Sequence, residues 1–191
     1  YAGTRDDPDL SNYAAYPVSR DSFRRKALRD LSGQTGIKLL GSIFRGASGV
    51  ISRETRESSL PLLRQLSVQL LLLLALLAAG IGWAYLVWLG TFLTFFMLII
   101  RIRQVAEHAA VPDLYDPDPR MNTRTVEAPW WQRLIFAPNG VNYHLEHHFM
   151  ASVPCYRLAA LRAHLKQRGA LDSVPVFRGY GQLLNHAVTA A

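Results

Sequence analysis

Three of the six histidines lie within five residues of one another, at His144, His147 and His148. If this segment is helical, positions i, i+3 and i+4 share one face, so the three imidazoles can converge on one small volume. Neutral imidazole is a common ligand for iron, copper, zinc and nickel. The chain has a single cysteine, Cys155, whereas a thiolate zinc site needs a cluster of cysteines. The spacing therefore favours a metal site over the alternative of a solvated, histidine-rich helical turn.

A fourth candidate ligand is His108, which directly follows Glu107. Arg103 stands four residues before Glu107, a spacing at which two side chains can pair across one helical turn. Such a pair could orient a ligand, or it could be an ordinary surface ion pair of small energetic value. Arg103, Glu107, Asn142 and Glu146 are the candidates for supporting the ligands without binding the metal themselves.

The elements that must position these residues are dominated by an apolar run. Residues 65–100 contain no Asp, Glu, Lys, Arg or His. As one helix at about 1.5 Å per residue the run would be about 54 Å long, too long for a hydrocarbon core of about 30 Å. Gly80 and Gly82 lie near its middle and favour a turn. We therefore expect a hairpin of two transmembrane helices, over residues 65–79 and 83–100.

The distribution of charge predicts the topology. The net charge is +7, and eleven Lys and Arg residues precede the apolar run while ten follow it. This is the positive-inside pattern, which places both polar flanks, and so both termini, in the cytoplasm. A basic chain also fits a soluble nucleic-acid-binding protein, but the basic residues do not cluster with aromatic residues in a recognisable binding module. We expect no nucleic-acid partner.

Three regions are predicted in all: a cytosolic and interfacial segment over residues 1–64, two transmembrane helices over residues 65–100, and a cytosolic cap over residues 101–191. In the first region, residues 19–31 form a basic amphipathic helix that suits either an anionic membrane surface or the surface of a globular domain. Its N-cap is Ser19 or Asp21.

The cap begins without a break in helical pattern. No helix breaker follows residue 100 until Pro112, so the second transmembrane helix is expected to reach His108. Further helices are predicted over residues 130–136, with an aromatic, membrane-facing edge, and over residues 156–168. His164 and His186 are expected to face solvent.

Taken together, these residues resemble the membrane fatty acid desaturase family, in the superfamily that also contains hydroxylases and carotenoid ketolases. The cluster over residues 144–148 matches the third histidine box, H-x-x-H-H. Residues 103–108 resemble the R-x-x-x-E-H element that follows the last membrane helix. Residues 153–158 and 3–10 resemble the stretches after the third and second boxes. One departure is Phe-Met-Ala at residues 149–151, where many relatives have Leu-Phe-Pro.

The resemblance implies an all-α integral-membrane fold, of which this chain is the C-terminal half: a transmembrane helical hairpin with a cytosolic helical cap. It also implies a non-haem di-iron centre whose ligands come from three boxes and one further histidine. The ligands in this chain would be His108, His144, His147 and His148. The first two boxes are expected upstream of Tyr1, so this segment alone is expected to hold an incomplete centre.

The activity implied is oxygen-dependent oxidation of a lipid acyl chain, with introduction of a double bond. Iron is the expected cofactor, molecular oxygen the co-substrate, and a lipid or acyl-carrier molecule the substrate. Electrons are expected from an external donor protein, because the sequence shows no haem or flavin module. No catalytic residue beyond the metal ligands is predicted. The alternatives are a hydroxylase or ketolase on the same scaffold, or a catalytically incomplete membrane fragment.

Overall fold

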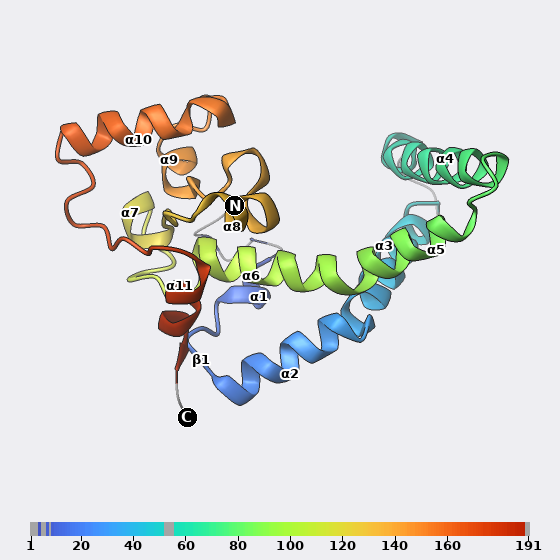
Figure 1. Cartoon of the computed structure of the whole chain (residues 1–191), viewed down its shortest axis with the longest axis horizontal. Helices are drawn as coiled ribbons and strands as arrows, with labels where there is room; N and C mark the ends of the chain where they lie inside the picture. The colour runs from blue at the N-terminus through green and yellow to red at the C-terminus, as the bar shows by residue number, and fades with distance from the viewer. Residues whose placement is uncertain (1–3, 5–6, 8, 52–55, 190–191) are drawn as a thin grey trace. The chain divides into compact units, whose positions relative to one another are not determined.

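The computed structural model of the chain describes residues 4, 7, 9–51 and 56–189, with the side chains of 45–51 and 56–61 outside that description. Part of the motif at residues 3–10 therefore lies outside the described residues. The fold is mostly helical, with 67% of residues in helices and few strands. It comprises two compact units, one formed by Tyr1–Arg25 with Ile99–Ala191 and the other by Lys26–Leu98. The all-α expectation is thus correct apart from two very short strands (Figure 1).

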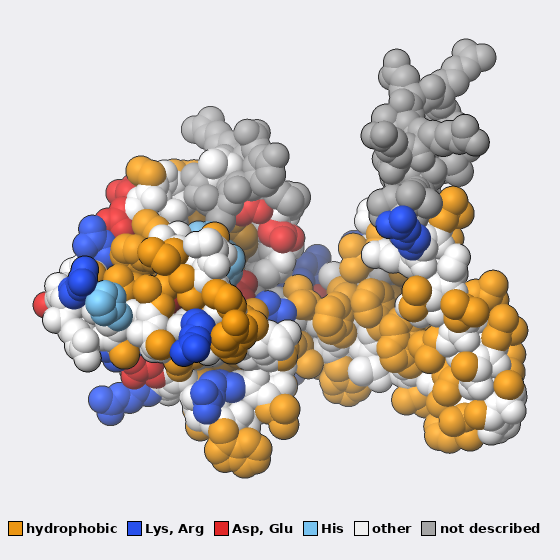
Figure 2. Space-filling view, turned by 90° about the horizontal axis from the view of Figure 1, so that it is seen from above, with side chains coloured by type: hydrophobic (Ala, Val, Ile, Leu, Met, Phe, Trp, Pro, Cys, Tyr) orange, Lys and Arg blue, Asp and Glu red, His pale blue; other side chains and the backbone are white. Residues whose placement is uncertain are grey.

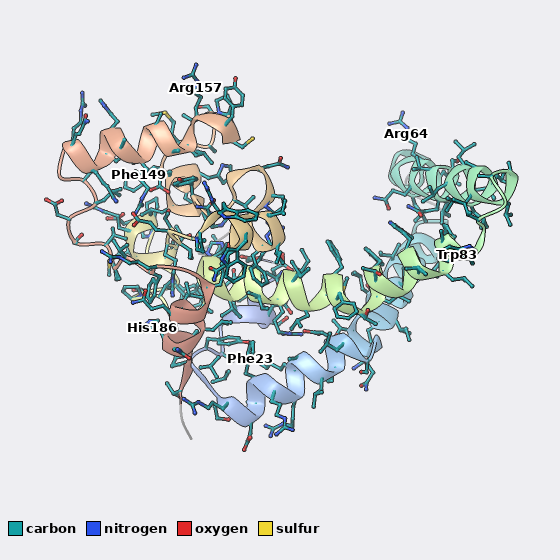
Figure 3. The ribbon with its side chains drawn as sticks, in the orientation of Figure 1. Phe23, Arg64, Trp83, Phe149, Arg157 and His186 are labelled. Carbon is teal, nitrogen blue, oxygen red and sulfur yellow. The ribbon has the colours of Figure 1, made fainter. Side chains whose placement is uncertain are left out.

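The Lys26–Leu98 unit is built from apolar helices. They are α3 (Gln34–Ile51), α4 (Arg56–Ala78), α5 (Trp83–Thr91) and the π-helical turn η1 (Phe92–Phe96). The predicted turn between α4 and α5 is confirmed: Gly80 has a φ of 73°, and its N–H donates to the carbonyl of Leu77 at 3.0 Å. A positive φ at this point suits glycine, which has no Cβ to clash. Figure 3 shows Trp83 at the start of α5, where the chain leaves the turn.

The helix after the turn is continuous from Trp83 to His108, because α5, η1 and α6 (Met97–His108) follow one another without a break. The predicted extension to His108 is therefore confirmed. In the described part of the chain, Trp83–His108 is the one helix long and apolar enough to cross a membrane, with a mean hydropathy of 2.0. Leu62–Ala78 is a shorter apolar helix. A second transmembrane helix, and insertion as a hairpin, stay predictions.

The π-helical turn lies where α3 and the long helix come closest. A Cβ built on Gly36 would stand 2.5 Å from the carbonyl oxygen of Leu93, nearer than real Cβ atoms approach a backbone. Glycine therefore lets α3 lie directly against the backbone of η1. Such π turns inside α-helices are uncommon and insert one extra residue into a turn.

The other unit contains the short elements. They are α1 (Leu10–Tyr13), β1 (Val18–Ser19), α7 (Pro119–Asn122), α8 (Trp130–Phe136), η2 (Pro138–Gly140), α9 (His144–Phe149), η3 (Cys155–Arg157), α10 (Leu158–Gln167), α11 (Tyr180–Ala187) and β2 (Val188–Thr189), with most of α6. Val105 of α6 and Ala109, the residue after α6, are fully buried in its main core, which also contains Tyr13 of α1 and Leu183 of α11. The end of α6, where His108 lies, is therefore packed into the core of this unit.

Two helices that the sequence predicted are confirmed in this unit. The helix expected over residues 130–136 is α8, and the one expected over residues 156–168 is α10 preceded by the 3₁₀ turn η3. β1 pairs in parallel with β2, with Val18 opposite Val188, a contact that the sequence did not indicate.

The basic helix predicted over residues 19–31 is α2 (Arg20–Leu31). Ser19 caps it, since its Oγ accepts the N–H of Ser22 at 3.2 Å. Arg24, Arg25 and Arg29 are exposed. The binding of this helix to a membrane surface stays a prediction.

Candidate metal centre

Two elements supply the histidines that meet in the structure. His108 is the last residue of α6, and His144 is the first residue of α9. The chain reverses just before α9 at Asn139 and Gly140, whose φ values are 59° and 73°. Asparagine and glycine are the residues that tolerate this left-handed conformation most readily. Leu145 then turns to the interior and is fully buried, which leaves the opposite side of α9 free for imidazoles.

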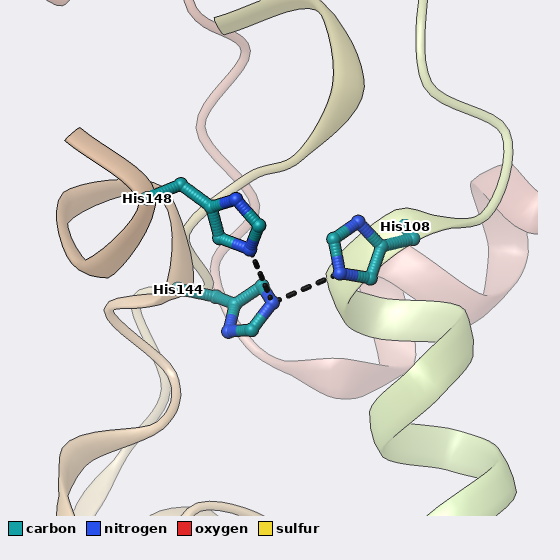
Figure 4. A group of neighbouring side chains, drawn as sticks. All are labelled: His108, His144 and His148. Carbon is teal, nitrogen blue, oxygen red and sulfur yellow. Dashed lines mark hydrogen bonds between the residues drawn. The ribbon is translucent and has the colours of Figure 1, made fainter. Parts of the chain in front are cut away.

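The three imidazole rings of His108, His144 and His148 point toward one another (Figure 4). Nε2 of His144 lies 3.0 Å from Nε2 of His108 and 3.2 Å from Nε2 of His148. The possible ligand atoms of all three lie within 4.8 Å of one another. Nitrogen atoms about 2.1 Å from one ion and at right angles around it would be about 3.0 Å apart. The spacing therefore fits donors that share an ion.

The orientation of the His108 ring is fixed by the backbone. Its Nδ1 lies 3.1 Å from the carbonyl oxygen of Asn122. A carbonyl only accepts hydrogen bonds, so Nδ1 carries the proton and Nε2 keeps a free lone pair. The ring of Tyr13 lies against His108 with centroids 5.2 Å apart, and the Tyr13 hydroxyl donates to the carboxylate of Asp7. A ligand histidine held through its other nitrogen is the usual arrangement in metal proteins.

Two histidines of α9, His144 and His148, are held in the neutral form that a metal requires. Burial lowers the pKa of His148 to about 4, with a further contribution from neighbouring histidines. The pKa of His144 lies well below its usual value, again mainly because of burial and then because of the imidazoles around it. Both rings are therefore uncharged at pH 7 and can donate a lone pair without first losing a proton.

His147 is placed differently from the other two histidines of its box. Its side chain is exposed, and its ring centroid lies 6.0 Å from that of His144 and 5.9 Å from that of His148. Successive residues of a helix turn by 100°, so positions i+3 and i+4 fall on opposite sides of position i. The close group contains two of the three box histidines, with His108 on the side of His148. A ligand role for His147 stays a prediction.

A hollow of about 310 Å³ opens beside His144 and His147. Its apolar lining comes from Val141, Val153 and Leu158, among others, and its polar lining includes Arg103. This is the space that His147 faces.

The supporting residues predicted from the sequence each have a partner. Arg103 and Glu107 pair at 3.5 Å, as their spacing indicated. The side-chain amide of Asn142 donates to the carbonyl of Val126 at 3.1 Å. Glu146 is fully buried, accepts from Arg162 Nη1 at 2.5 Å, and also accepts from the hydroxyl of Thr125.

The remaining histidines lie outside this group. His164 and His186 are both exposed, as expected. His186 lies on α11 (Figure 3), where its Nε2 is 3.2 Å from the carbonyl oxygen of Ala110.

Sequence reasoning did not identify Asn122, Thr125 or Arg162. Asn122 acts through its backbone, which no side-chain pattern can show. Arg162 did leave a signal: it stands four residues after Leu158, on the face of α10 that is buried, and the arginine side chain is 7% exposed. A charged residue on an apolar helix face must have a partner, because an unpaired buried charge is costly.

Among the described residues, the fold and site define a mostly helical protein with one helix long and apolar enough to cross a membrane and with a candidate histidine metal site. Residues 1–180 match the family model described as fatty acid desaturase. The chain therefore belongs to the fatty acid desaturase family, which implies iron-dependent oxidoreductase activity on lipids in a membrane context. No curated protein and no solved structure matches the chain.

Proposed function

We propose that this chain contributes to oxygen-dependent, di-iron oxidation of a lipid acyl chain, with introduction of a double bond. The observation that carries the proposal is the convergence of three imidazole Nε2 atoms from α6 and α9, at 3.0 and 3.2 Å, in a member of the desaturase family. The residues that would hold metal are His108, His144 and His148, with His147 on the side of the neighbouring hollow.

When bound, iron supplies the oxidising power that removal of hydrogen from an unactivated methylene requires. The part played by the protein is to hold neutral donors in place and to keep water away. His108 is 8% exposed, and the carbonyl of Asn122 sets its tautomer. The lone pair of its Nε2 is therefore free to bind a metal ion. Burial keeps His144 and His148 uncharged. The chain thus brings preformed ligands, rather than flexible side chains that an ion must gather.

We place the reacting segment of the acyl chain in the hollow beside His144 and His147. Its lining of Val141, Val153 and Leu158 suits a hydrocarbon chain, and Arg103 gives it one polar wall. The hollow suits the class of substrate expected for the family, a lipid or acyl-carrier molecule. Its lining does not indicate which carrier bears the acyl chain.

The membrane setting of the proposal rests on the apolar helix Trp83–His108, which ends at a candidate ligand. We propose that residues 65–79, most of which belong to the shorter apolar helix Leu62–Ala78, also cross the membrane, that residues 1–64 and 101–191 lie on the cytoplasmic side, and that an external donor protein delivers electrons there. Basic residues flanking the apolar run support this orientation.

The test is lipid profiling of a host that expresses the protein from its complete gene, together with iron analysis of the purified protein. We expect a new unsaturated acyl chain and bound iron. The His148→Ala variant should lose both, whereas His164→Ala, a matched change at an exposed histidine of α10, should keep both. Unaltered iron content and product in His148→Ala would refute the ligand assignment. A hydroxylated or ketonic product would assign the chain to the other activities of the superfamily.

A further inference from the structure

A buried segment joins the two halves of the histidine group. It is the linking segment, residues 122–126 (Asn-Thr-Arg-Thr-Val), and each of its residues is between 1% and 5% exposed. It belongs to no regular helix or strand beyond the last residue of α7, yet it is among the least exposed parts of the unit. Irregular backbone at such depth must have its polar groups satisfied by specific partners.

One set of partners lies on α6. The carbonyl of Asn122 meets Nδ1 of His108 at 3.1 Å, and the hydroxyl of Thr123 donates to the carbonyl of Glu107 at 3.0 Å. The guanidinium of Arg124 donates to the carbonyl of Ala109. The carbonyls of Glu107 and Ala109 belong to the last turn of α6 and to the residue after it, where the helix itself offers no N–H partner. The linking segment therefore caps the helix that ends in His108.

A second set of partners lies on α9 and the turn before it. The hydroxyl of Thr125 donates to the carboxylate of Glu146, and the N–H of Leu145 donates to the carbonyl of Arg124 at 3.3 Å. Val126 and Asn142 bond to each other twice: the Val126 N–H to the Asn142 carbonyl at 3.0 Å, and the Asn142 amide to the Val126 carbonyl at 3.1 Å. Successive residues of one short segment thus contact first one ligand-bearing element and then the other.

Arg162 secures the α9 side from behind. It donates to the buried carboxylate of Glu146 at 2.5 Å and to Glu127, one residue past the linking segment, at 3.0 Å. Both oxygens of Glu146 are therefore engaged, one by Thr125 and one by Arg162. Because Glu146 lies between His144 and His147 on α9, its fixed position also fixes the rotation of that helix.

We propose that the linking segment is a positioning element of the metal centre, in which Thr123 and Thr125 hold α6 and α9 in register and so set the spacing of His108 against His144 and His148. This rests on the proposed function, since it assumes that those histidines bind one ion. Neither threonine contacts the ion position; each acts through the element to which it is bonded. Supporting hydrogen bonds of this kind alter metal affinity by about 10–100-fold when they are removed.

The experiment is a Co²⁺ titration, followed by visible absorption, of the protein expressed from its complete gene and purified in detergent. The variants Thr123→Val and Thr125→Val keep the shape of the side chain and remove its hydroxyl. We expect each to weaken Co²⁺ binding by about 10–100-fold and to alter the cobalt spectrum, and we expect Thr123→Ser and Thr125→Ser to restore both. Thr94→Val is the matched control, because it removes a hydroxyl that bonds only the carbonyl of Gly90, at 2.7 Å within its own helix.

The outcomes are separable. Wild-type affinity and spectrum in both valine variants, alongside lost binding in His144→Ala, would overturn the positioning role and leave the metal centre standing. Lowered thermal stability without any change in Co²⁺ affinity would overturn it as well, since that is what a merely structural contact gives. Absence of Co²⁺ binding by the wild-type chain would overturn the proposed function together with this inference. If Thr125→Val does not fold, Arg162→Lys tests the same link at the other oxygen of Glu146, with the same expected and contrary results.

Discussion

The two compact units of this protein differ in the side chains that they bury and expose. The unit that contains the histidine group buries polar side chains and pairs some of them with one another: Glu146, Arg162 and Thr125 form one hydrogen-bonded set in its interior. The Lys26–Leu98 unit does the reverse and leaves apolar side chains on its outside, with Leu86 70% and Trp83 67% exposed. In Figure 2 its described surface is mostly hydrophobic, whereas that of the histidine unit mixes charged and apolar groups.

The contrast indicates which force organises each unit. Buried hydrogen bonds are directional, so they can place a ring nitrogen to within a fraction of an ångström. Apolar contact is non-directional, and an exposed leucine face of this kind would suit an apolar surrounding such as a bilayer. In the histidine unit, hydrogen bonds therefore fix the positions of individual side chains. In the Lys26–Leu98 unit, the exposed apolar side chains instead determine which surroundings suit the unit. Substitutions in each unit test this difference separately.

Replacement of Arg162 by Met should damage the histidine unit most. It leaves the Glu146 carboxylate buried without its charged partner, and loss of one member of a buried pair costs about 3–5 kcal/mol. Chemical denaturation in detergent measures the change in the free energy of unfolding. Arg157→Met, at an exposed arginine just before α10 (Figure 3), should change it by less than about 0.5 kcal/mol. Equal stability of the two variants would contradict the account of the buried pair.

An arginine in place of Leu86 should affect the other unit through its surroundings. At the centre of a membrane helix an arginine costs about 2.5–3.5 kcal/mol of insertion free energy; Leu86 lies three residues after the start of the helix, so the cost there is smaller, though larger than on a surface in water. Leu86→Arg should therefore lower the membrane-inserted fraction, measured by alkaline extraction, and Leu86→Ile should not. Recovery of the unaltered chain in the aqueous fraction would rule out the membrane reading of this helix.

The contact between α3 and η1 can be broken without any charge. In Gly36→Ala the new methyl group meets the Leu93 carbonyl at 2.5 Å, and the overpacking should cost about 1–3 kcal/mol. Gly90→Ala, which has open space around it, should instead stabilise by up to about 1 kcal/mol through helix propensity. Thermal unfolding of the two variants gives the comparison, and a shift of the same sign in both would show that the close approach is of no consequence.

The smallest effect is expected at Lys166, whose Nζ lies 2.6 Å from Glu127 at the edge of the buried network. The lysine, followed by Arg162, holds the pKa of Glu127 below its usual value. A lowered folded-state pKa contributes stability above the unfolded pKa and loses it as the pH falls through the folded one. Lys166→Met should therefore be less stable by at most about 1 kcal/mol at pH 7, and indistinguishable from wild type in acid. A loss that persists in acid would indicate packing rather than charge.

Sequence patterns predicted the parts of this structure that depend on neighbours along the chain. Gly80 indicated the turn, and Ser19 indicated the start of α2. The absence of a helix breaker predicted that the helix extends to His108. The pairing of Arg103 with Glu107 followed from its four-residue spacing. The candidate ligands were also found this way, because three of them are close together in sequence.

What the patterns missed depends on contacts between distant residues. Thr125 meets Glu146 across 21 positions and Asn122 meets His108 across 14, distances over which no periodicity operates. The prediction that all three box histidines converge depended on helical spacing alone. In the structure the possible ligand atoms of His108, His144 and His148 lie within 4.8 Å of one another, and a ligand role for His147 stays a prediction.

The separation of His108 from His144 has one more consequence. These residues are 36 positions apart, so an ion bound by both closes a long loop as a cross-link would. The unfolded chain has no such preformed pair, and any ligand that binds the folded form alone stabilises it in proportion to the logarithm of its free concentration. The supply of metal would then affect the stability of this unit as well as its activity.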